Sequence, residues 1–380
     1  MNILYFTEYF PESENAELTG GVESRTYHLA KELAKKHNIT IITTTQHNPR
    51  IQNFQNMLII RCKKLPYTHT GYKKERLQTA IKMYKTGERF IKRNKIDIID
   101  SHNFFTYYPA SKLAQKYKIK HFVNYHETWI NNWVKNTGSK AGIIGEIAER
   151  FILNNLKKNN TRFIAVSNFT KNKLIQNNIK NKISVVYNGI NLDKYKIKVK
   201  KEKHPTIVSM SRLTPLKRTK DIIKALKIIK QEIPNIKLKI IGDGEEKNNL
   251  IKLTKQLQLE NNIEFLGFIE KHDDVLKILK SSHIFCLPSV LEGFGIATAE
   301  AMASEVPYVS SNIPPTREIT QNGKAGLLYK PTDHNELAIN VIKLLKDKSL
   351  YKKKQEEGKK LAKNYDWSKL AKQLEKEYFY

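Results

Sequence analysis

The chain has 380 residues, 40% of them hydrophobic, which is enough to bury the cores of two domains. Its two cysteines lie far apart, which argues against a metal cage or a disulfide framework, and no apolar stretch is long enough to predict a membrane-spanning helix. The first ten residues predict a strand and not a signal peptide, so we expect a cytoplasmic protein.

The charge is strongly positive: 67 lysines and arginines against 37 acidic residues give a formal net charge of +30. Three interpretations compete. Lysines are scattered through every predicted helix, which favours a solvated basic surface without a dedicated partner. An anionic membrane surface is the second interpretation and nucleic acid the third. We expect no nucleic acid, because the chain has no recognised binding motif and no face on which basic and aromatic residues alternate.

Short apolar runs alternate with amphipathic segments along the chain. In the first half, buried parallel strands are predicted near residues 2–7, 39–45, 96–101, 120–126, 162–167 and 183–188. The polar, basic stretch 191–205 is typical of a linker. Beyond it, strands are predicted near 206–211, 238–244, 263–268, 283–289, 306–311 and 326–330, followed by a last amphipathic helix. This order predicts an α/β fold with two doubly wound, Rossmann-like domains facing a cleft.

Two glutamates flank a glycine turn in LPSVLEGFGIATAEAMA, residues 287–303. Glu292 lies at the turn, and Glu300 lies two helical turns into the helix that follows. Each carboxylate can accept two hydroxyl hydrogen bonds, as a sugar diol requires. The amides at the start of this helix form an anion site suited to a diphosphate. They belong to Phe294, Gly295, Ile296 and Ala297. A nucleotide sugar combines a diphosphate with hydroxyls on either side of it.

The string EGFGIATAE resembles the E-x(7)-E signature of glycosyltransferase family 4 (group 1), retaining enzymes of the GT-B fold. The resemblance extends from the Gly-Gly pair at residue 20 to the final helix. It implies an acceptor-side domain over 1–195, a nucleotide-sugar-binding domain over 204–364, and a helix over 365–380 that returns to the first domain. It also implies transfer of a hexosyl unit from a UDP- or GDP-sugar to an acceptor hydroxyl. The nucleotide sugar is then a co-substrate, and no metal or other cofactor is expected, since there is no Asp-x-Asp motif.

Other motifs carry the same resemblance. The string SRLTPLKRTKDI is similar to the segment that carries the family's Arg…Lys pair, and Arg218 is a rival to Lys217 for the role of the lysine. The string VNYHETW is similar to the family's T-x-H-D segment, with Asn124 in place of the threonine and Glu127 in place of the aspartate. The implied catalytic residues are His126, Arg212, Lys217 and Glu292. The implied donor-binding residues are Gly20, Gly21, Asn188, Gly242, Asp243, Phe268, Phe294, Gly295, Ile296, Ala297 and Glu300. On the acceptor side we expect His102, Glu127 and Trp129.

The acceptor is less constrained by the sequence. An anionic membrane interface would suit the basic amphipathic stretch 71–95 and the tryptophans Trp129 and Trp133. The protein would then be peripheral at the inner face of the cell membrane. Its acceptor would be a lipid-linked sugar or another surface glycan precursor. The alternatives are an ordinary solvated helix and a packed aromatic loop. Two other functions stay open: a GT-B nucleotide-sugar epimerase, which would need catalytic carboxylates in both halves, and a basic nucleic-acid-binding protein.

Overall fold

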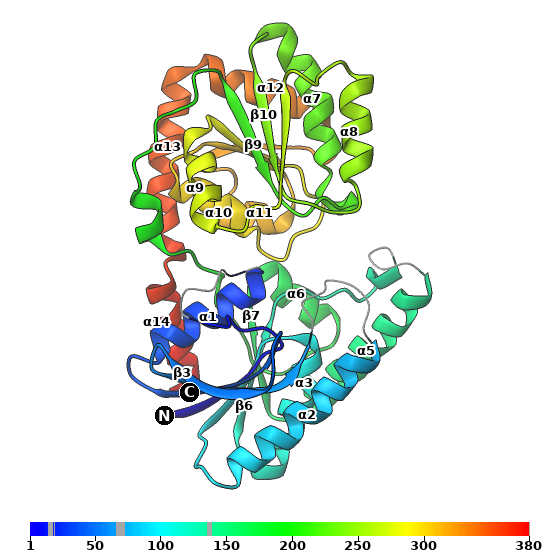
Figure 1. The fold of residues 1–380 in the computed structure, drawn as a ribbon, viewed down its shortest axis with the longest axis vertical. Helices are drawn as coiled ribbons and strands as arrows, with labels where there is room; N and C mark the ends of the chain where they lie inside the picture. Colours follow the sequence, from blue (N-terminus) through cyan, green and yellow to red (C-terminus); the bar gives the residue numbers. More distant parts are fainter. Residues whose placement is uncertain (14–17, 19, 66–72, 135–138, 380) are drawn as a thin grey trace. The chain divides into compact units, whose positions relative to one another are not determined.

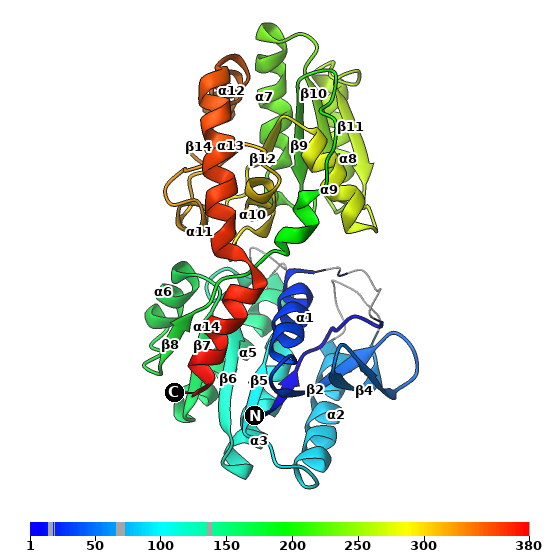
Figure 2. The same cartoon turned by 90° about the vertical axis from the view of Figure 1, so that its left-hand side faces the viewer.

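The computed structural model describes residues 1–13, 18, 20–65, 73–134 and 139–379, which form two compact units (Figures 1 and 2). The first unit combines Met1–Tyr187 with Trp367–Tyr380, and the second is Asn188–Asp366. The expected linker at 191–205 therefore lies inside the second unit. Its Tyr195 is buried in a short 3-10 helix, and the ammonium group of Lys201 donates to the carbonyl of Ser282. Polar composition suggested a linker there, but Tyr195 and Lys201 attach this stretch to the second unit.

The first unit is built on an eight-stranded sheet with the order β3-β4-β2-β1-β5-β6-β7-β8. The strands are β1 (Asn2–Phe6), β2 (Asn38–Thr45), β3 (Arg50–Phe54), β4 (Met57–Lys64), β5 (Ile98–Ser101), β6 (Lys120–Tyr125), β7 (Thr161–Ala165) and β8 (Ile183–Val185). All neighbours are parallel except β3 and β4. The sequence did not predict β3 and β4. β3 lies at the sheet edge and is partly exposed along its length, so it lacks the continuous apolar run of a buried strand.

Helices cover both faces of this sheet (Figure 1). They include α1 (Gly21–Leu33), α2 (Lys73–Ile91), α3 (Phe104–Tyr117), α5 (Ser139–Lys158), α6 (Asn168–Gln176) and α14 (Trp367–Phe379). α14 packs against α1 and buries Trp367, Leu370 and Leu374 in the same core as Leu29 and Leu33. The C-terminal helix thus completes the core of the N-terminal unit, as the resemblance implied.

The second unit has a six-stranded, wholly parallel sheet with the order β11-β10-β9-β12-β13-β14. Its strands are β9 (Thr206–Met210), β10 (Lys237–Ile241), β11 (Ile263–Gly267), β12 (Ile284–Leu287), β13 (Tyr308–Ser311) and β14 (Gly326–Tyr329). Its helices include α7 (Thr219–Glu232), α8 (Lys247–Gln256), α9 (His272–Ser281), α10 (Ile296–Ala303), α11 (Pro314–Ile319), α12 (His334–Lys346) and α13 (Lys348–Ala362). The strand order reverses between β9 and β12, which is where doubly wound sheets bind ligands. Within the described ranges, no helix has both the length and the apolar character needed to cross a bilayer.

The last turn of α14 brings a phenol into the middle of the first unit. Tyr378 donates a hydrogen bond to Asp100 Oδ2, and its hydroxyl lies 3.1 Å from that of Tyr5. Asn124 Nδ2 donates to the other oxygen, Asp100 Oδ1, at 2.8 Å. All four side chains are buried. Asp100 therefore depends on the last helix of the chain for one of its donors.

We predict that Tyr378→Phe destabilises the first unit by about 1–3 kcal/mol, because a buried carboxylate loses a hydrogen-bond donor that water cannot replace. Calorimetric unfolding measures the effect. Gln373→Ala, on the exposed face of the same helix, is the control and should unfold as the wild type does. An unchanged unfolding transition for Tyr378→Phe would show that the hydroxyl contributes nothing to stability.

Candidate active site

Predicted site residues of the second unit gather at one edge of its sheet. Arg212 and Lys217 follow β9, Asp243 follows β10, Phe268 follows β11 and Glu292 follows β12. Because all six strands are parallel, these loops leave the sheet at its common carboxyl edge. The β9 and β12 loops flank the point where the strand order reverses.

Two residues predicted to be catalytic meet at this point. Lys217 Nζ donates to Glu292 Oε1 at 2.6 Å, and both side chains are mostly buried. The backbone reinforces the contact, since the amide of Val290 donates to the carbonyl of Leu216 at 3.0 Å. The β9 and β12 loops are therefore joined through both side chains and main chain.

The neighbouring cations have different environments. Arg212 is exposed, and within the described part of the chain it forms no ion pair. Arg218, the rival for the second role, holds Asp221 through two hydrogen bonds of 2.6 and 2.9 Å at the start of α7. Its charge is matched by that carboxylate, as the charge of Lys217 is matched by Glu292, so of these three cations only Arg212 has no ion pair among the described residues.

Glycines of the β10 loop allow it to lie directly on the β9 loop. A Cβ at Gly242 would stand 1.9 Å from the carbonyl oxygen of Ser211, and the φ of Gly242 is +128°. The amide of Leu213 donates to the carbonyl of Asp243 at 2.9 Å. Only a residue without a side chain permits this approach, which fixes the backbone on both sides of Arg212. The Asp243 carboxylate accepts from Lys247 Nζ at 2.8 Å, beside the start of α8.

The glycine turn after β12 leads directly into α10. Gly295 has a φ of +87° and precedes the first residue of the helix, Ile296. The Phe294 ring is buried against Tyr365, with ring centroids 5.7 Å apart, so it anchors the turn. On either side of the turn, Ser289 Oγ and Thr298 Oγ1 are buried and form no hydrogen bond with other described residues. Buried polar atoms without partners are costly, so the surroundings of this turn are not optimised for stability alone.

Glu300 is held by two residues that the sequence did not single out. Its Oε1 accepts hydrogen bonds from His272 Nε2 at 2.8 Å and from the Tyr195 hydroxyl at 3.2 Å. Burial lowers the pKa of His272, but the hydrogen bond and charge of Glu300 outweigh this effect, so the pKa is raised above its ordinary value. No motif includes either partner, and only the fold brings both to α10.

The first unit has its own reversal point, between β1 and β5. Here Asn103 Oδ1 accepts from Thr7 Oγ1 at 2.7 Å and from the amide of Glu8 at 2.9 Å. Glu8 is 4% exposed; its Oε1 receives no hydrogen bond from the described residues, and its Oε2 lies 3.8 Å from Arg76. Burial raises the pKa of Glu8 to about 6, although the charge of Arg76 opposes the shift. The sequence analysis missed Glu8, which belongs to no motif and looks like the end of a strand.

Two predicted histidines lie at the same edge, after β5 and β6. Neither ring nitrogen of His102 has a hydrogen-bond partner among the described residues, nor does His126 Nε2. Burial, aided by the charge of Arg25, lowers the pKa of His126 to about 3, and the pKa of His102 is also well below its ordinary value, because of burial and the nearby His126. Both imidazoles are therefore neutral and suited to hydrogen-bonding a neutral polar ligand.

Asn124 of β6 connects helix α1 to strand β5. Its Oδ1 accepts from Arg25 Nε at 3.1 Å and from Arg25 Nη2 at 3.0 Å, while its Nδ2 donates to Asp100. A threonine, which the resemblance led us to expect here, would have to accept from Arg25 and donate to Asp100 through a single oxygen, whereas asparagine does so through two separate atoms, Oδ1 and Nδ2.

The loop that carries Trp129 and Trp133 is packed against the first unit, which agrees with the packed aromatic loop given as an alternative to a membrane interface. Trp133 Nε1 donates to Glu149 Oε2 at 2.5 Å, and the Trp129 amide donates to the same carboxylate. The two indole rings lie 4.9 Å apart, and Gly145 of α5 makes room for the Trp133 ring. Glu149 thus fixes both tryptophans, which are only partly exposed.

The remaining predicted residues are dispersed over both units. Gly20 precedes α1 in an extended conformation, and Gly21 is its exposed first residue. Asn188 is the buried first residue of the second unit. Glu127 is half-buried beside His126 in the sequence. Ala297 lies in the first turn of α10. Their roles stay predictions.

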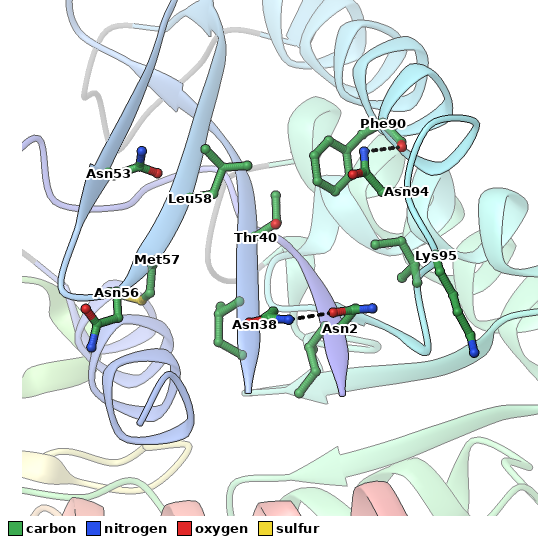
Figure 3. Close-up of a pocket in the computed structure, with 13 residues that line it drawn as sticks. Asn2, Asn38, Thr40, Asn53, Asn56, Met57, Leu58, Phe90, Asn94 and Lys95 are labelled. Carbon is green, nitrogen blue, oxygen red and sulfur yellow. Dashed lines mark hydrogen bonds between the residues drawn. The ribbon is translucent and has the colours of Figure 1, made fainter. Parts of the chain in front are cut away.

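A cavity of about 480 Å³ lies elsewhere in the first unit (Figure 3). Its lining includes the first residues of β1 and β2, the β3–β4 hairpin and the end of α2. It is rich in asparagine: Asn2, Asn38, Asn53, Asn56 and Asn94. This is the amino edge of the sheet, opposite to Glu8 and the histidines, so the cavity is not the candidate active site. Across the described ranges, no group of three or more His, Cys, Asp or Glu side chains could hold a metal ion.

Comparisons with known proteins agree with this architecture. The family model for glycosyltransferase family 4 matches residues 19–194, and the one for glycosyl transferases group 1 matches residues 192–361. An uncharacterized glycosyltransferase of Methanocaldococcus jannaschii is 29% identical over 303 residues, which are 78% of this chain and 79% of that one. Together the two family models cover the chain from residue 19 to residue 361.

Solved structures share the fold over the whole chain. Sucrose-phosphate synthase from Thermosynechococcus elongatus superimposes with a TM-score of 0.80 at 18% identity, covering 100% of this chain and 98% of that one. HepE of Anabaena, solved in complex with UDP-glucose, gives a TM-score of 0.75 at 18% identity and covers 99% of both chains. The fold is thus that of the GT-B enzymes. The chain belongs to the group 1, family 4-like glycosyltransferases and is a hexosyltransferase.

We predict that Glu8→Gln stabilises the first unit in a pH-dependent way. A raised pKa means that the folded state binds the Glu8 proton more tightly than the unfolded state. Stability is therefore lost as the pH rises from 4.5 to about 6. The glutamine has no proton to lose, so its advantage over the wild type should grow by about 2 kcal/mol across that range. Calorimetry at pH 4.5 and 7.5 measures it. Glu32→Gln, which removes a surface pair with Lys35, is the control, and an equal gain at both pH values would contradict the prediction.

Proposed function

We propose that this glycosyltransferase moves a hexosyl unit from a UDP- or GDP-sugar to an acceptor hydroxyl with retention of anomeric configuration. The observation that carries the proposal is the Lys217–Glu292 pair at the reversal point of the second sheet, beside the glycine turn that starts α10. A cation, a carboxylate and a helix N-terminus together can bind a phosphate and the sugar attached to it.

Each part of the donor has a matching group in the second unit. Arg212, Lys217 and the first amides of α10 would bind the diphosphate, and Glu292, next to Lys217, would bind hydroxyls of the transferred sugar. Glu300, deeper in the helix, would accept from the ribose diol. Phe268 has 60% of its surface exposed after Gly267 and would stack on the base. UDP-glucose, the donor bound by HepE, is the first to test.

The proposed chemistry breaks the bond between the anomeric carbon and the diphosphate oxygen and forms one from that carbon to the acceptor oxygen on the same face. The acceptor proton passes to the departing phosphate oxygen. The sugar gains positive charge in the transition state while the diphosphate gains negative charge, which Arg212 and Lys217 would stabilise. These cations supply the charge without a metal ion, so the proposal includes none.

We expect one of UDP, GDP and ADP to raise the melting temperature of the wild-type protein in a thermal-shift screen, and to do so much less with Arg212→Ala or Glu300→Ala. Each variant loses a charge-assisted contact of about 1.5–3 kcal/mol, a loss of about tenfold or more in affinity. Arg317→Ala, an exposed arginine on α11, is the matched control and should keep the full shift. If no nucleotide shifts the wild type, the donor site is wrong.

One observation favours the alternative function of a nucleotide-sugar epimerase, which would need catalytic carboxylates in both units. Glu8 is a buried carboxylate in the first unit. Incubating UDP-glucose and UDP-N-acetylglucosamine with the enzyme, without an acceptor, separates the two functions. A transferase leaves the sugar configuration unchanged or slowly hydrolyses the donor, whereas an epimerase converts the sugar at one ring carbon. Nuclear magnetic resonance of the reaction mixture distinguishes these products.

A lipid-linked acceptor is supported by the surface of the first unit. α2 and α5 both pack against α3. α5 exposes four large apolar side chains on successive turns: Ile143, Ile144, Ile147 and Phe151, each more than half exposed. On α2, Leu77 and Ile81 are also exposed. The exposed charged residues of the described stretch 73–95 are all cationic: Lys82, Lys85, Arg89, Lys92, Arg93 and Lys95. Apolar side chains beside clustered cations suit an anionic membrane interface.

We predict that the protein binds vesicles of phosphatidylcholine and phosphatidylglycerol, and that Ile147→Glu weakens binding about tenfold by placing a charge among the apolar side chains. Vesicle flotation measures the bound fraction. Ile339→Glu replaces an isoleucine of similar exposure on α12 of the second unit and should bind as the wild type does. Binding that needs no phosphatidylglycerol, or that survives Ile147→Glu, would contradict the proposed surface.

A further inference from the structure

The carboxylate of Glu300 is asymmetric in its contacts. Both of its hydrogen bonds, from His272 Nε2 at 2.8 Å and from the Tyr195 hydroxyl at 3.2 Å, end on the same oxygen, Oε1. From the residues that the structure describes, no hydrogen bond reaches Oε2. A carboxylate can accept on both oxygens, so half of its capacity is unused within the protein.

The two donors come from separate parts of the second unit. Tyr195 lies in the 3-10 helix Leu192–Lys196, at the beginning of the unit, and its ring is 6% exposed. His272 is the first residue of α9, in the connection that follows Phe268 and β11. The carbonyl of Tyr195 also accepts from Lys280 Nζ at 2.6 Å, so the tyrosine is tied to the far end of α9 as well. Tyr195 and α9 therefore form a support for Glu300 that does not depend on α10.

Holding one oxygen from two directions restricts the side chain. Glutamate has three rotatable side-chain bonds. If these bonds are unrestrained, ordering them when the ligand binds costs conformational entropy and lowers the affinity for the ligand. Two donors on Oε1 fix the plane and direction of the carboxylate before the ligand arrives. The remaining lone pairs on Oε2 are then already directed for a hydroxyl donor.

We propose that Tyr195 and His272 are positioning residues, which hold Glu300 Oε1 so that Oε2 accepts from a ribose hydroxyl of the donor nucleotide. This inference rests on the proposed function, since it assigns the ribose to Glu300. It adds a basis for selecting ribonucleotides over deoxyribonucleotides: the discrimination depends on the two residues behind the carboxylate as well as on the carboxylate itself.

The test compares UDP with 2′-deoxy-UDP by titration calorimetry on the full-length protein, or GDP with 2′-deoxy-GDP if the thermal-shift screen selects guanine. We expect the wild type to prefer the ribonucleotide about tenfold or more, the value of one hydrogen bond to a charged acceptor. His272→Ala should bring the preference close to unity while changing the affinity for the deoxynucleotide little. Tyr195→Phe, which removes only the hydroxyl, should lower the preference partially.

Two further variants distinguish positioning from general damage. His272→Gln keeps an N–H donor on a side chain of similar reach and should restore most of the preference. Asp274→Asn, two residues further along the same helix and with a side chain that is 47% exposed, should behave as the wild type does. If His272→Ala keeps the wild-type preference, or weakens both nucleotides equally, the inference is wrong although the donor site stands. If the wild type binds none of the nucleotides, the proposed function fails and this inference fails with it.

Discussion

The first unit is organised around a carboxylate buried in the centre of its sheet. Asp100 is the penultimate residue of β5, and it accepts hydrogen bonds from Asn124 on β6 and Tyr378 on α14. Burial raises the pKa of Asp100 to about 7, although these donors and the charge of Arg25 lower it. Arg25 of α1 donates in turn to Asn124, so hydrogen bonds connect α1, β6 and α14 to Asp100. His102 and His126 follow β5 and β6 at the same edge of the sheet.

The sequence predicted the buried strands because both faces of a doubly wound sheet are covered, which leaves continuous apolar runs. It could not predict the β3–β4 hairpin at the sheet edge, where burial is partial. The glycine turn and Glu300 were predictable from their motif. The contact between Lys217 and Glu292 was not, since the two residues are 75 positions apart and only the neighbouring order of β9 and β12 brings them together. Glu8, Tyr195 and His272 were missed for the same reason.

Both units gather polar side chains where the strand order of their sheet reverses, but the charge of these side chains differs between the two units. Each has a reversal of strand order, and each gathers polar side chains there. In the second unit the group is charged, with Lys217 and Glu292 in contact and Arg212 exposed nearby. In the first unit it is Glu8 with two neutral histidines, and Glu8 Oε1, both ring nitrogens of His102 and His126 Nε2 have no hydrogen-bond partner among the described residues. A charged edge is suited to an anionic diphosphate, while the neutral edge is suited to the hydroxyl groups of a sugar.

The return of α14 to the first unit affects the order in which the chain can fold during synthesis. The second unit is continuous, from Asn188 to Asp366, so all of its residues have been made before α14 appears. The first unit begins earlier but lacks Trp367, Leu370, Leu374 and Tyr378 until α14 has been synthesised. Its core faces and the Asp100 carboxylate stay uncovered until then. The N-terminal unit is thus completed after the second unit, and a truncation that removes α14 would damage the half of the protein that was synthesised first.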